Sequence, residues 1–382
     1  MNFVKLKEIC QLLNGRAYKQ EELLSSGKYK VLRVGNFFSD KDYFYSNLDL
    51  EENKYCDTGD LLFAWSASFG PKIWNGGKVI YHYHIWKIIL SESVDKKYLY
   101  YYLFFMSERI KAEGHGGIMI HTTKQEMEER LIPLPPIDEQ KRIAAVLDKC
   151  ADIIAKRKQQ LSALDNLIKA RFVEMFGDPE TNPMGWPKVG LPMVVQGKAS
   201  NGYFAKREEY VKDGNVAVLG VAYVVNRMYS QVDNLPHTNA TAEDIKKYRV
   251  KYGDMLFCRS SLVAEGIGKA SIIPENTPDN TLFECHVIRL PLNLEKCIPE
   301  FMQVLSTTDY FRNQMIAQSK TATMTTIGQD GILKAIIILP QIEKQRDFYF
   351  FVKQIDKTKA NIQKSLEKSQ LLFDSLMQEY FG

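Results

Sequence analysis

Two stretches of the chain share one pattern of apolar and polar positions. In each, apolar residues recur at alternating steps of four and three, which is the spacing of a coiled-coil seam. The first seam consists of Ile143, Leu147, Cys150, Ile154, Arg157, Leu161, Leu164, Ile168, Arg171 and Met175. The second consists of Phe348, Val352, Ile355, Lys359, Ile362, Leu366, Ser369, Phe373, Leu376 and Tyr380. The pattern predicts two long helices, over residues 134–177 and 339–382.

The two helices are copies of one another. Subtracting the first seam from the second gives 205 throughout, from 348 − 143 to 380 − 175, and the same offset relates Pro340 to Pro135 and Gly382 to Gly177. Equal length and register with matching ends indicate an internal duplication. We expect the helices to pair as an antiparallel coiled coil, because pairing buries both stripes at once. In the alternative, each helix covers only its own domain.

The segments that precede the helices repeat as well, with an offset that grows along the chain as loop insertions would make it. The anchors are Gln196-Gly197-Lys198 against Asn14-Gly15-Arg16 (182), Val218 against Val31 (187), Gly253-Asp254 against Gly59-Asp60 (194) and His286 against His84 (202). The predicted fold is α+β: two similar mixed α/β domains separated by two long helices. The predicted boundaries are 1–132 and 178–337 for the domains, and 133–177 and 338–382 for the helices.

Composition narrows the classes of protein only slightly. A formal net charge of +4 over 382 residues permits a nucleic-acid partner without requiring one. The six cysteines form no CxxC pair, the N-terminus has no signal-peptide core, and the apolar run YLYYYLFFM is too short to cross a bilayer. We therefore expect a cytoplasmic protein with free thiols and no membrane association.

The loops of the two copies differ almost completely, as on a scaffold that presents two recognition surfaces. These loops and the strands beside them carry side chains suited to DNA phosphates and base edges. The DNA-binding candidates are Arg16, Lys19, Arg33, Trp65, Ser66, Ser68, Lys72 and Lys78 in the first copy, and Lys198, Asn201, Lys206, Arg207, Arg259, Ser260, Ser261 and Lys269 in the second. The competing interpretation for any one of them is solvated surface charge.

Catalytic patterns are missing from the sequence. It contains no phosphate-cradling glycine loop, no HExxH and no zinc spacing among its cysteines. Asp254 with Glu265 and Lys269 is the nearest approach to a nuclease site, and a turn followed by a loop explains it better. His82 and His84 would share a strand face, but without a third ligand a structural or DNA-facing role is favoured over a metal.

The chain resembles the specificity subunits of type I restriction–modification systems over essentially its whole length. The resemblance rests on Leu134-Pro-Pro-Ile-Asp-Glu-Gln140 with Arg142-Ile143, on Phe176-Gly177-Asp-Pro179, and on the two Gly-Asp turns, all in order. It implies two target-recognition domains that each read half of a split DNA sequence. It also implies docking of two methyltransferase subunits, which bind S-adenosylmethionine, and of restriction subunits that use ATP and Mg²⁺.

The resemblance further implies that this chain is not an enzyme and binds no cofactor or metal of its own. The helix starts are the expected docking sites for partner subunits, with Pro135, Pro136, Glu139, Gln140, Arg142, Pro340 and Gln345 as candidates. The second start departs from the first, because Gln341 and Lys344 replace Pro136 and Glu139. A helix of about 38 residues spans roughly 57 Å. We expect this length to fix an unread gap on the order of one DNA turn of about 10 bp.

Two other functions stay open at this point. One is a scaffold that grips partner proteins without DNA, against which the Arg, Lys and Ser residues in both sets of loops argue. The other is an enzyme that cuts or methylates DNA alone, against which the missing motifs argue.

Overall fold

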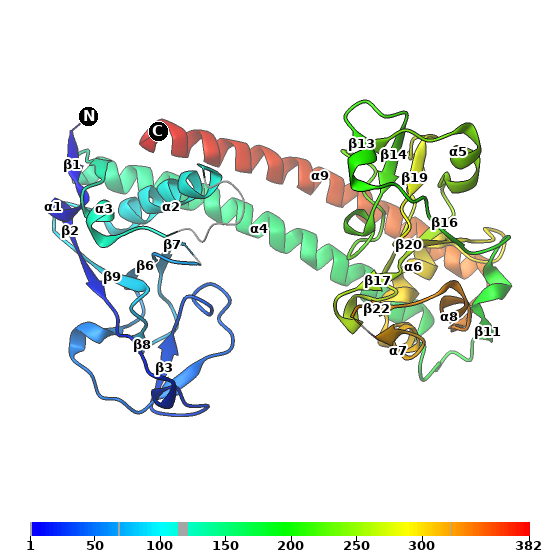
Figure 1. Ribbon diagram of the computed structural model, residues 1–382, viewed down its shortest axis with the longest axis horizontal. Coiled ribbons are helices and arrows are strands. Elements are labelled where there is room, and N and C mark those ends of the chain that lie inside the picture. Colours follow the sequence, from blue (N-terminus) through cyan, green and yellow to red (C-terminus); the bar gives the residue numbers. More distant parts are fainter. Residues whose placement is uncertain (1, 68, 114–120, 322) are drawn as a thin grey trace. The chain divides into compact units, whose positions relative to one another are not determined.

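The computed structural model describes residues 2–67, 69–113, 121–321 and 323–382. The chain divides into two compact units. Unit 1 comprises Met1–Gln159 and Gln363–Gly382, and unit 2 comprises Gln160–Ile362. The long helices α4 (Ile137–Phe176) and α9 (Ile342–Phe381) each contribute one half to each unit (Figure 1). Each unit is described by itself below.

Unit 1 is built on two four-stranded sheets. The first has the order β2-β9-β6-β7 and is antiparallel, and the second has the order β4-β3-β8-β5 with β3 and β8 parallel. The strands of the first are β2 (Cys10–Asn14), β9 (Ile85–Leu90), β6 (Leu61–Ala64) and β7 (Gly70–Ile73). Those of the second are β4 (Phe44–Ser46), β3 (Tyr29–Leu32), β8 (Val79–Tyr81) and β5 (Tyr55–Cys56). The remaining elements are β1 (Phe3–Lys5) paired with β10 (Leu131–Pro133), α1 (Leu6–Ile9), α2 (Lys96–Glu113) and α3 (Lys124–Glu128).

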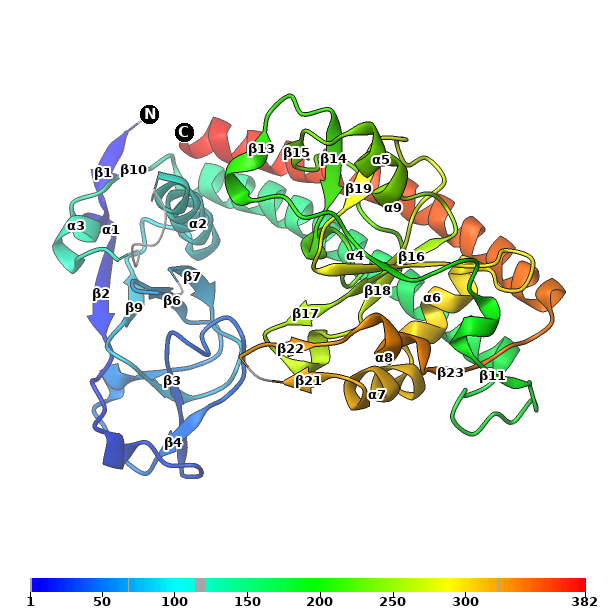
Figure 2. The ribbon, with the colours of Figure 1, turned by 45° about the vertical axis from the view of Figure 1, so that its right-hand side comes forward.

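Unit 2 repeats the strand order of the first sheet and the parallel pair of the second, but the outermost strand of its second sheet lies at the opposite edge. Its antiparallel sheet has the order β12-β20-β16-β18, and its second sheet has the order β13-β15-β14-β19 with β14 and β19 parallel. The strands are β12 (Ser200–Asn201), β20 (Val287–Pro291), β16 (Asp254–Cys258), β18 (Ala270–Ile272), β13 (Tyr210–Val211), β15 (His237–Thr238), β14 (Val216–Leu219) and β19 (Thr281–Phe283). Two further pairings are β11 (Lys188–Gly190) with β23 (Ile336–Ile338), and the small sheet of β17 (Ser260–Ser261), β22 (Thr325–Thr326) and β21 (Lys320–Thr321) (Figure 2). The helices are α5 (Ala242–Tyr248), α6 (Pro299–Thr307), α7 (Asp309–Ala317) and α8 (Gln329–Leu333).

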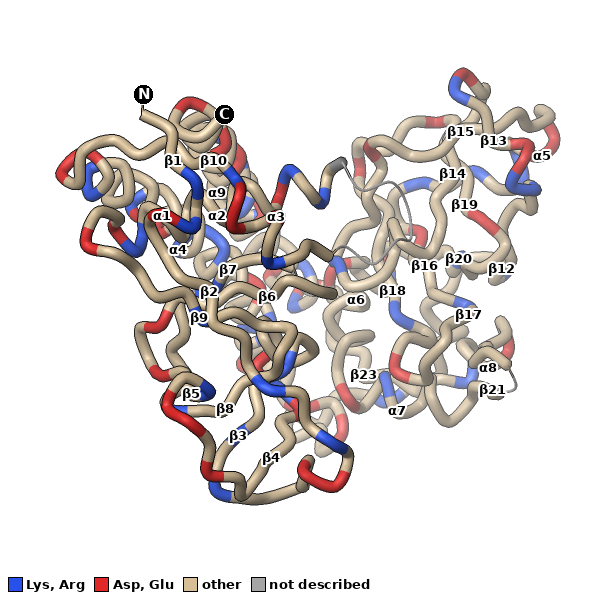
Figure 3. The backbone as a smooth tube through the Cα atoms, turned by 60° about the vertical axis from the view of Figure 1, so that its left-hand side comes forward, with Lys and Arg blue, Asp and Glu red and all other residues tan. Residues whose placement is uncertain are grey.

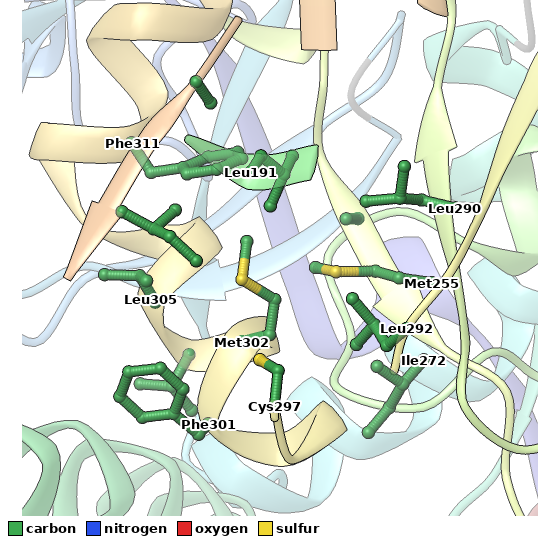
Figure 4. Close-up of a cluster of buried hydrophobic side chains, with 14 of the residues drawn as sticks. Leu191, Met255, Ile272, Leu290, Leu292, Cys297, Phe301, Met302, Leu305 and Phe311 are labelled. Carbon is green, nitrogen blue, oxygen red and sulfur yellow. The ribbon is translucent and has the colours of Figure 1, made fainter. Parts of the chain in front are cut away.

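The long helices supply core residues to both units. Among the predicted seam positions, every one is buried or partly buried. In unit 1, Ile143 and Leu147 of α4 share a core with Phe373 of α9, and in unit 2, Phe172 of α4 shares a core with Phe348 of α9. In each unit the first half of one helix therefore packs with the second half of the other. The core of unit 2 continues through Leu191, Met255, Leu290, Met302 and Phe311 (Figure 4).

The Gly-Asp turns prove to be matched structural devices. Gly59 and Gly253 both have a φ of 94°, a left-handed conformation that glycine adopts without a Cβ penalty. The aspartate after each glycine accepts the backbone N–H of the residue three positions before it. The Asp60 carboxylate accepts the Asp57 N–H at 2.8 Å, and the Asp254 carboxylate accepts the Lys251 N–H at 3.0 Å. Asp254 thus completes a turn, as the sequence favoured.

One predicted repeat anchor needs correction. The structural counterpart of Gly15 is Gly202 rather than Gly197. A Cβ on Gly15 would meet the Tyr81 carbonyl oxygen at 2.2 Å, and a Cβ on Gly202 would meet the Phe283 and Glu284 carbonyl oxygens at 2.3 and 2.2 Å. Around Gly197 there is open space instead, with no atom within 4 Å of its Cβ position. The true offset is 202 − 15 = 187, the same as for Val31 and Val218.

Gln140 and Gln345 hold the starts of the long helices in the same way. The Gln140 amide accepts the Asp95 N–H at 2.8 Å and donates to the Ser93 and Pro135 carbonyls at 3.0 and 2.8 Å. The Gln345 amide accepts the Ile298 N–H at 2.9 Å and donates to the Lys296 and Pro340 carbonyls at 3.2 and 2.8 Å. Both side chains are fully buried. Both glutamines therefore have a structural role, because a fully buried side chain presents no surface to a partner subunit.

Charge is spread through the molecule. Figure 3 shows Lys and Arg interspersed with Asp and Glu along the backbone of both units. Within the described ranges, no helix is long and apolar enough to cross a membrane. With charge so evenly spread, a binding site is defined by where particular side chains meet.

Candidate nucleic-acid interface

In unit 1, the end of β6 meets the turn between β8 and β9. The Trp65 backbone N–H donates to the His84 carbonyl at 3.1 Å, and its indole Nε1–H donates to the Tyr83 carbonyl at 2.9 Å. The Trp65 ring lies against the rings of Tyr83 and His84, with centroid distances of 6.0 and 4.7 Å. Strand ends thereby gather an aromatic surface of the kind on which bases stack.

Arg16 joins this surface from the end of β2. Its N–H donates to the Tyr81 carbonyl at 3.0 Å, and its own carbonyl accepts the Tyr83 N–H at 3.1 Å. The guanidinium makes a bidentate pair with Glu22, at 2.9 and 2.7 Å, which holds it in a fixed orientation and raises its pKa. We call Arg16, Trp65 and the turn His82–His84 the unit 1 cluster.

Burial disfavours the charged form of the two histidines of this cluster. Burial lowers the pKa of His82 to about 4, and the neighbouring His84 and Arg33 add to the shift. Burial also lowers the pKa of His84. Over the described residues, no group of three or more His, Cys, Asp or Glu side chains is placed to hold a metal ion. The pair is therefore suited to hydrogen bonding or stacking as neutral imidazoles.

In unit 2, the same backbone junction carries different side chains. The Arg259 N–H donates to the His286 carbonyl at 2.9 Å, and the guanidinium Nη1 donates to the Cys285 carbonyl at 3.3 Å. These two bonds reproduce those of Trp65. The next element is anchored identically, because the Trp65 carbonyl accepts the Thr122 N–H at 3.3 Å and the Arg259 carbonyl accepts the Ile327 N–H at 3.0 Å. Trp65 and Arg259 are thus equivalent residues of one duplicated site.

Polar groups surround Arg259 where aromatic rings surround Trp65. His286 Nδ1 lies 3.3 Å from the Ser260 hydroxyl, and Tyr203 takes the place of Arg16, donating its N–H to the Phe283 carbonyl at 2.7 Å. We call Tyr203, Arg259, Ser260 and the turn Glu284–His286 the unit 2 cluster. Arginine and serine are able to read base edges or to bind phosphates.

The structure places other predicted DNA-binding residues of unit 1 outside the cluster. Lys72 is partly buried and donates to the Phe37 carbonyl at 2.7 Å, and Lys78 pairs with Glu52 at 3.3 Å. Arg33 lies over the Phe44 ring at 5.1 Å, and Lys19 is exposed. Ser66 is buried, and Ser68 lies outside the described residues.

In unit 2, Ser261 continues β17 beside Ser260, and Asn201 directly precedes Gly202 on β12. Lys198, Lys206 and Arg207 are exposed, and Lys269 donates to Asn226 Oδ1 at 2.7 Å. For all of these residues and those of the preceding paragraph, DNA contact stays a prediction.

The helix starts retain several accessible partner-binding candidates. Glu139 and Arg142 form a bidentate ion pair at 2.7 and 2.6 Å on the surface of α4. Pro136 is exposed and Pro135 partly so, whereas Pro340 is buried. The two starts therefore differ in what they expose.

Sequence reasoning missed the turns as part of each cluster. Tyr83, Cys285 and Tyr203 were not singled out, because backbone carbonyls contribute the contacts and leave no side-chain signature. The repeat of His84 as His286 was the one available signal.

The chain is similar to known proteins in sequence and in fold. Residues 1–164 match the family model described as the type I restriction modification DNA specificity domain. The type I restriction enzyme EcoBI specificity subunit of Escherichia coli is 20% identical over 405 residues, which cover 98% of this chain and 83% of that protein. The MjaVIII specificity subunit of Methanocaldococcus jannaschii is 24% identical over 336 residues, which cover 81% of this chain and 76% of that protein.

Among solved structures, the S subunit of a type I restriction–modification system from M. genitalium has a TM-score of 0.54 at 14% identity. The superposition covers 100% of this chain and 96% of that one, which supports the fold. The matched family model and the curated relatives show that the chain is similar in sequence to the specificity subunits of type I restriction enzymes.

Proposed function

We propose that the unit 1 and unit 2 clusters are two DNA-reading heads, each of which selects one half of a bipartite target. The observation that carries the proposal is the repeated bond to the turn carbonyl, made by Trp65 in one unit and by Arg259 in the other. A single backbone frame thus presents two chemistries. Trp65 with neutral histidines favours stacking or apolar contact, whereas Arg259 with Ser260 favours guanine or phosphate.

In this proposal the paired long helices form an antiparallel coiled coil that sets the unread gap between the two half-sites. Support comes from the equal lengths of α4 and α9, 40 residues each, and from the burial of their seam positions. Adding one heptad to both helices should lengthen the gap, and an unchanged gap would refute the spacer.

The remaining activities belong to partners. Two methyltransferase subunits dock on the chain, with the exposed Glu139–Arg142 pair and Pro135–Pro136 as contacts at the first helix start. They bind S-adenosylmethionine and methylate adenines on the selected sites, while restriction subunits supply ATP- and Mg²⁺-dependent cleavage. This chain contributes recognition and no catalytic group.

Single-molecule methylation mapping of DNA from cells that express the chain with its methyltransferase tests the proposal. The expected result is a split motif with methylated adenines in both halves. A motif with only one specified half would show that only one of the two clusters reads DNA sequence. Absence of methylation from an assembled complex would favour the scaffold function instead.

A further inference from the structure

Unit 2 contains a pocket that the duplicated clusters do not explain. Its volume is about 560 Å³, and its lining comes from α4, α9, the loop of residues 226–228, the start of β18 with the residue before it, and helices α6 and α7. Five cationic side chains line it, Lys169, Arg227, Lys269, Arg312 and Lys359, against the single carboxylate of Asp165. A cavity with this excess of positive charge attracts anions.

Few of these cations are neutralised within the protein. Lys359 pairs with Asp165 at 2.5 Å, and Lys269 donates to the neutral amide oxygen of Asn226. Lys169 is exposed and makes no hydrogen bond or ion pair that can be identified among the described residues. Like charges that share a cavity repel one another, and a bound anion would relieve that repulsion.

Arg312 connects the pocket to the loop that follows β17, residues 262–267, which we call the recognition loop. Its Nη2 donates to the carbonyls of Glu265 and Ile267, at 3.1 and 2.5 Å, in the loop that follows β17. Its Nη1 is buried and has no hydrogen-bond partner in the part of the chain that the structure describes. An unpaired buried donor of this kind is unfavourable. An oxyanion in the pocket would satisfy it.

Two of the five cations have no cationic counterpart in unit 1. The helix offset pairs Lys359 with Ile154 (359 − 205) and Lys169 with Asp374 (169 + 205). Ile154 is buried in an apolar core, and Phe373, beside Asp374, packs against Tyr101 and Phe104 at centroid distances of 6.1 and 6.4 Å. The common scaffold therefore does not require cations at these positions.

We propose that this pocket binds a phosphate group, carried either by the DNA backbone or by a free polyphosphate. Lysines and a guanidinium with a spare N–H are the groups that proteins use for phosphate. For the DNA source, the inference rests on the proposed function, since the contact would position the duplex beside Arg259. For a free polyphosphate, Arg312 would link occupancy to the recognition loop.

The test compares Lys169→Gln with Lys357→Gln, an exposed α9 lysine that lies outside the pocket lining. Purified full-length chains are titrated with a duplex oligonucleotide over a range of salt concentrations, and separately with pyrophosphate while thermal unfolding is recorded. If the pocket binds a DNA phosphate, Lys169→Gln should make the negative slope of log K against log salt shallower by about 1. A free polyphosphate predicts that pyrophosphate raises the wild-type midpoint and has much less effect on Lys169→Gln.

Either effect, absent from Lys357→Gln, supports the pocket and identifies the source. If Lys169→Gln and Lys357→Gln behave alike in both titrations, the proposal is overturned. Arg259→Gln separates the two hypotheses: it should weaken DNA binding while leaving the pyrophosphate response intact. A wild-type chain that binds no DNA but responds to pyrophosphate would contradict the proposed function and support the pocket.

Discussion

Where each long helix joins its domain, the two units share the same hydrogen bonds to the backbone but carry side chains of opposite charge. Gln140 and Gln345 make the same three hydrogen bonds. Their bonds to the N–H groups of Asp95 and Ile298 make these two residues equivalent, at an offset of 298 − 95 = 203. At that offset Lys97 corresponds to Glu300, and at the helix offset of 205 Asp148 corresponds to Lys353. Lys97 pairs with Asp148 in unit 1. In unit 2, Glu300 is buried and accepts the hydroxyls of Tyr229 and Tyr252, both at 3.2 Å.

The helix starts show the same reversal. Glu139 and Arg142 form an ion pair on α4, and the equivalent positions on α9 are Lys344 and Asp347. The comparison teaches that the buried amide and the apolar core specify the common plan, while the charges distinguish the copies. In unit 2, Lys353 pairs with Glu275 at 3.3 Å. We expect each domain to match its own helix, because an exchange would bring Lys97 to the helix of Lys353 and Glu300 to the helix of Asp148.

The largest effect should come from the shared close approach at Gly15 and Gly202. Gly15→Ala and Gly202→Ala each push a Cβ into carbonyl oxygens, and we expect a loss of about 3 kcal/mol of unfolding free energy in either unit. Gly197→Ala meets open space at a φ of 89°, and should cost only about 1–2 kcal/mol. Denaturant unfolding measures all three. Equal losses for Gly197→Ala and Gly202→Ala would contradict the equivalence of Gly15 with Gly202.

The buried amides come next. Gln140→Ala and Gln345→Ala each leave one N–H and two carbonyls unpaired, and each should lower the unfolding free energy by about 2–3 kcal/mol. Gln354→Ala, at an exposed position of α9, is the control and should stay within about 0.5 kcal/mol of wild type. Thermal unfolding provides the comparison. A neutral Gln345→Ala beside a damaging Gln140→Ala would break the symmetry of the two junctions.

Charge at the junction should have a smaller effect. Lys97→Glu places a carboxylate against Asp148, and because both side chains are partly exposed we expect a cost of about 1 kcal/mol. Lys97→Gln, which only removes the pair, should cost less. At low salt, we expect the thermal midpoint to be highest for the wild type, lower for Lys97→Gln and lowest for Lys97→Glu. If the three thermal midpoints converge at high salt, the effect is electrostatic. If Lys97→Glu has the same midpoint as the wild type, the charges do not match each domain to its helix.

The pH dependence of unit 2 should show the smallest effect. Burial raises the pKa of the Glu300 carboxyl above its ordinary value of 4.5, against the lowering influence of Tyr229, Lys353 and Tyr252. The folded state therefore binds this proton more tightly than the unfolded state. Stability is lost as pH rises from about 4.5 through the raised pKa. Glu300→Gln should flatten that decline above pH 4.5 in a series of thermal scans. An unchanged pH profile would show that Glu300 is already ionised without cost.

Much of the fold could be predicted from the sequence, because the internal repeat shows in short sequence patterns that recur at a constant offset. Helical spacing and helix ends are local, so the 205-residue offset between Pro135 and Pro340 could be read directly. The Gly-Asp turns were legible for the same reason. The insertion before β12 was not, since Gln196-Gly197-Lys198 resembles Asn14-Gly15-Arg16 in composition. Only the close approach of Gly202 to the end of β19 shows which glycine is equivalent.

The sites were less predictable. Trp65 and Arg259 were identified as candidates from their positions after the Gly-Asp strands, but their bonds run to backbone carbonyls 18 and 26 residues away. Such contacts carry no residue signature. Gln140 and Gln345 belong to the motif that suggested partner docking, and burial shows that they hold the fold. Sequence cannot separate these two uses of a glutamine, because accessibility depends on tertiary packing.

The most direct measurement is methylation mapping of two matched variants, Trp65→Phe and Arg259→Gln, each expressed with the methyltransferase partner. Each change removes the bond to the turn carbonyl in one unit and leaves the other unit untouched. We expect Trp65→Phe to relax or change one half of the split motif and Arg259→Gln the other half, with the gap between them unchanged. Two variants that affect the same half, or both halves alike, would contradict the assignment of one reading head to each unit.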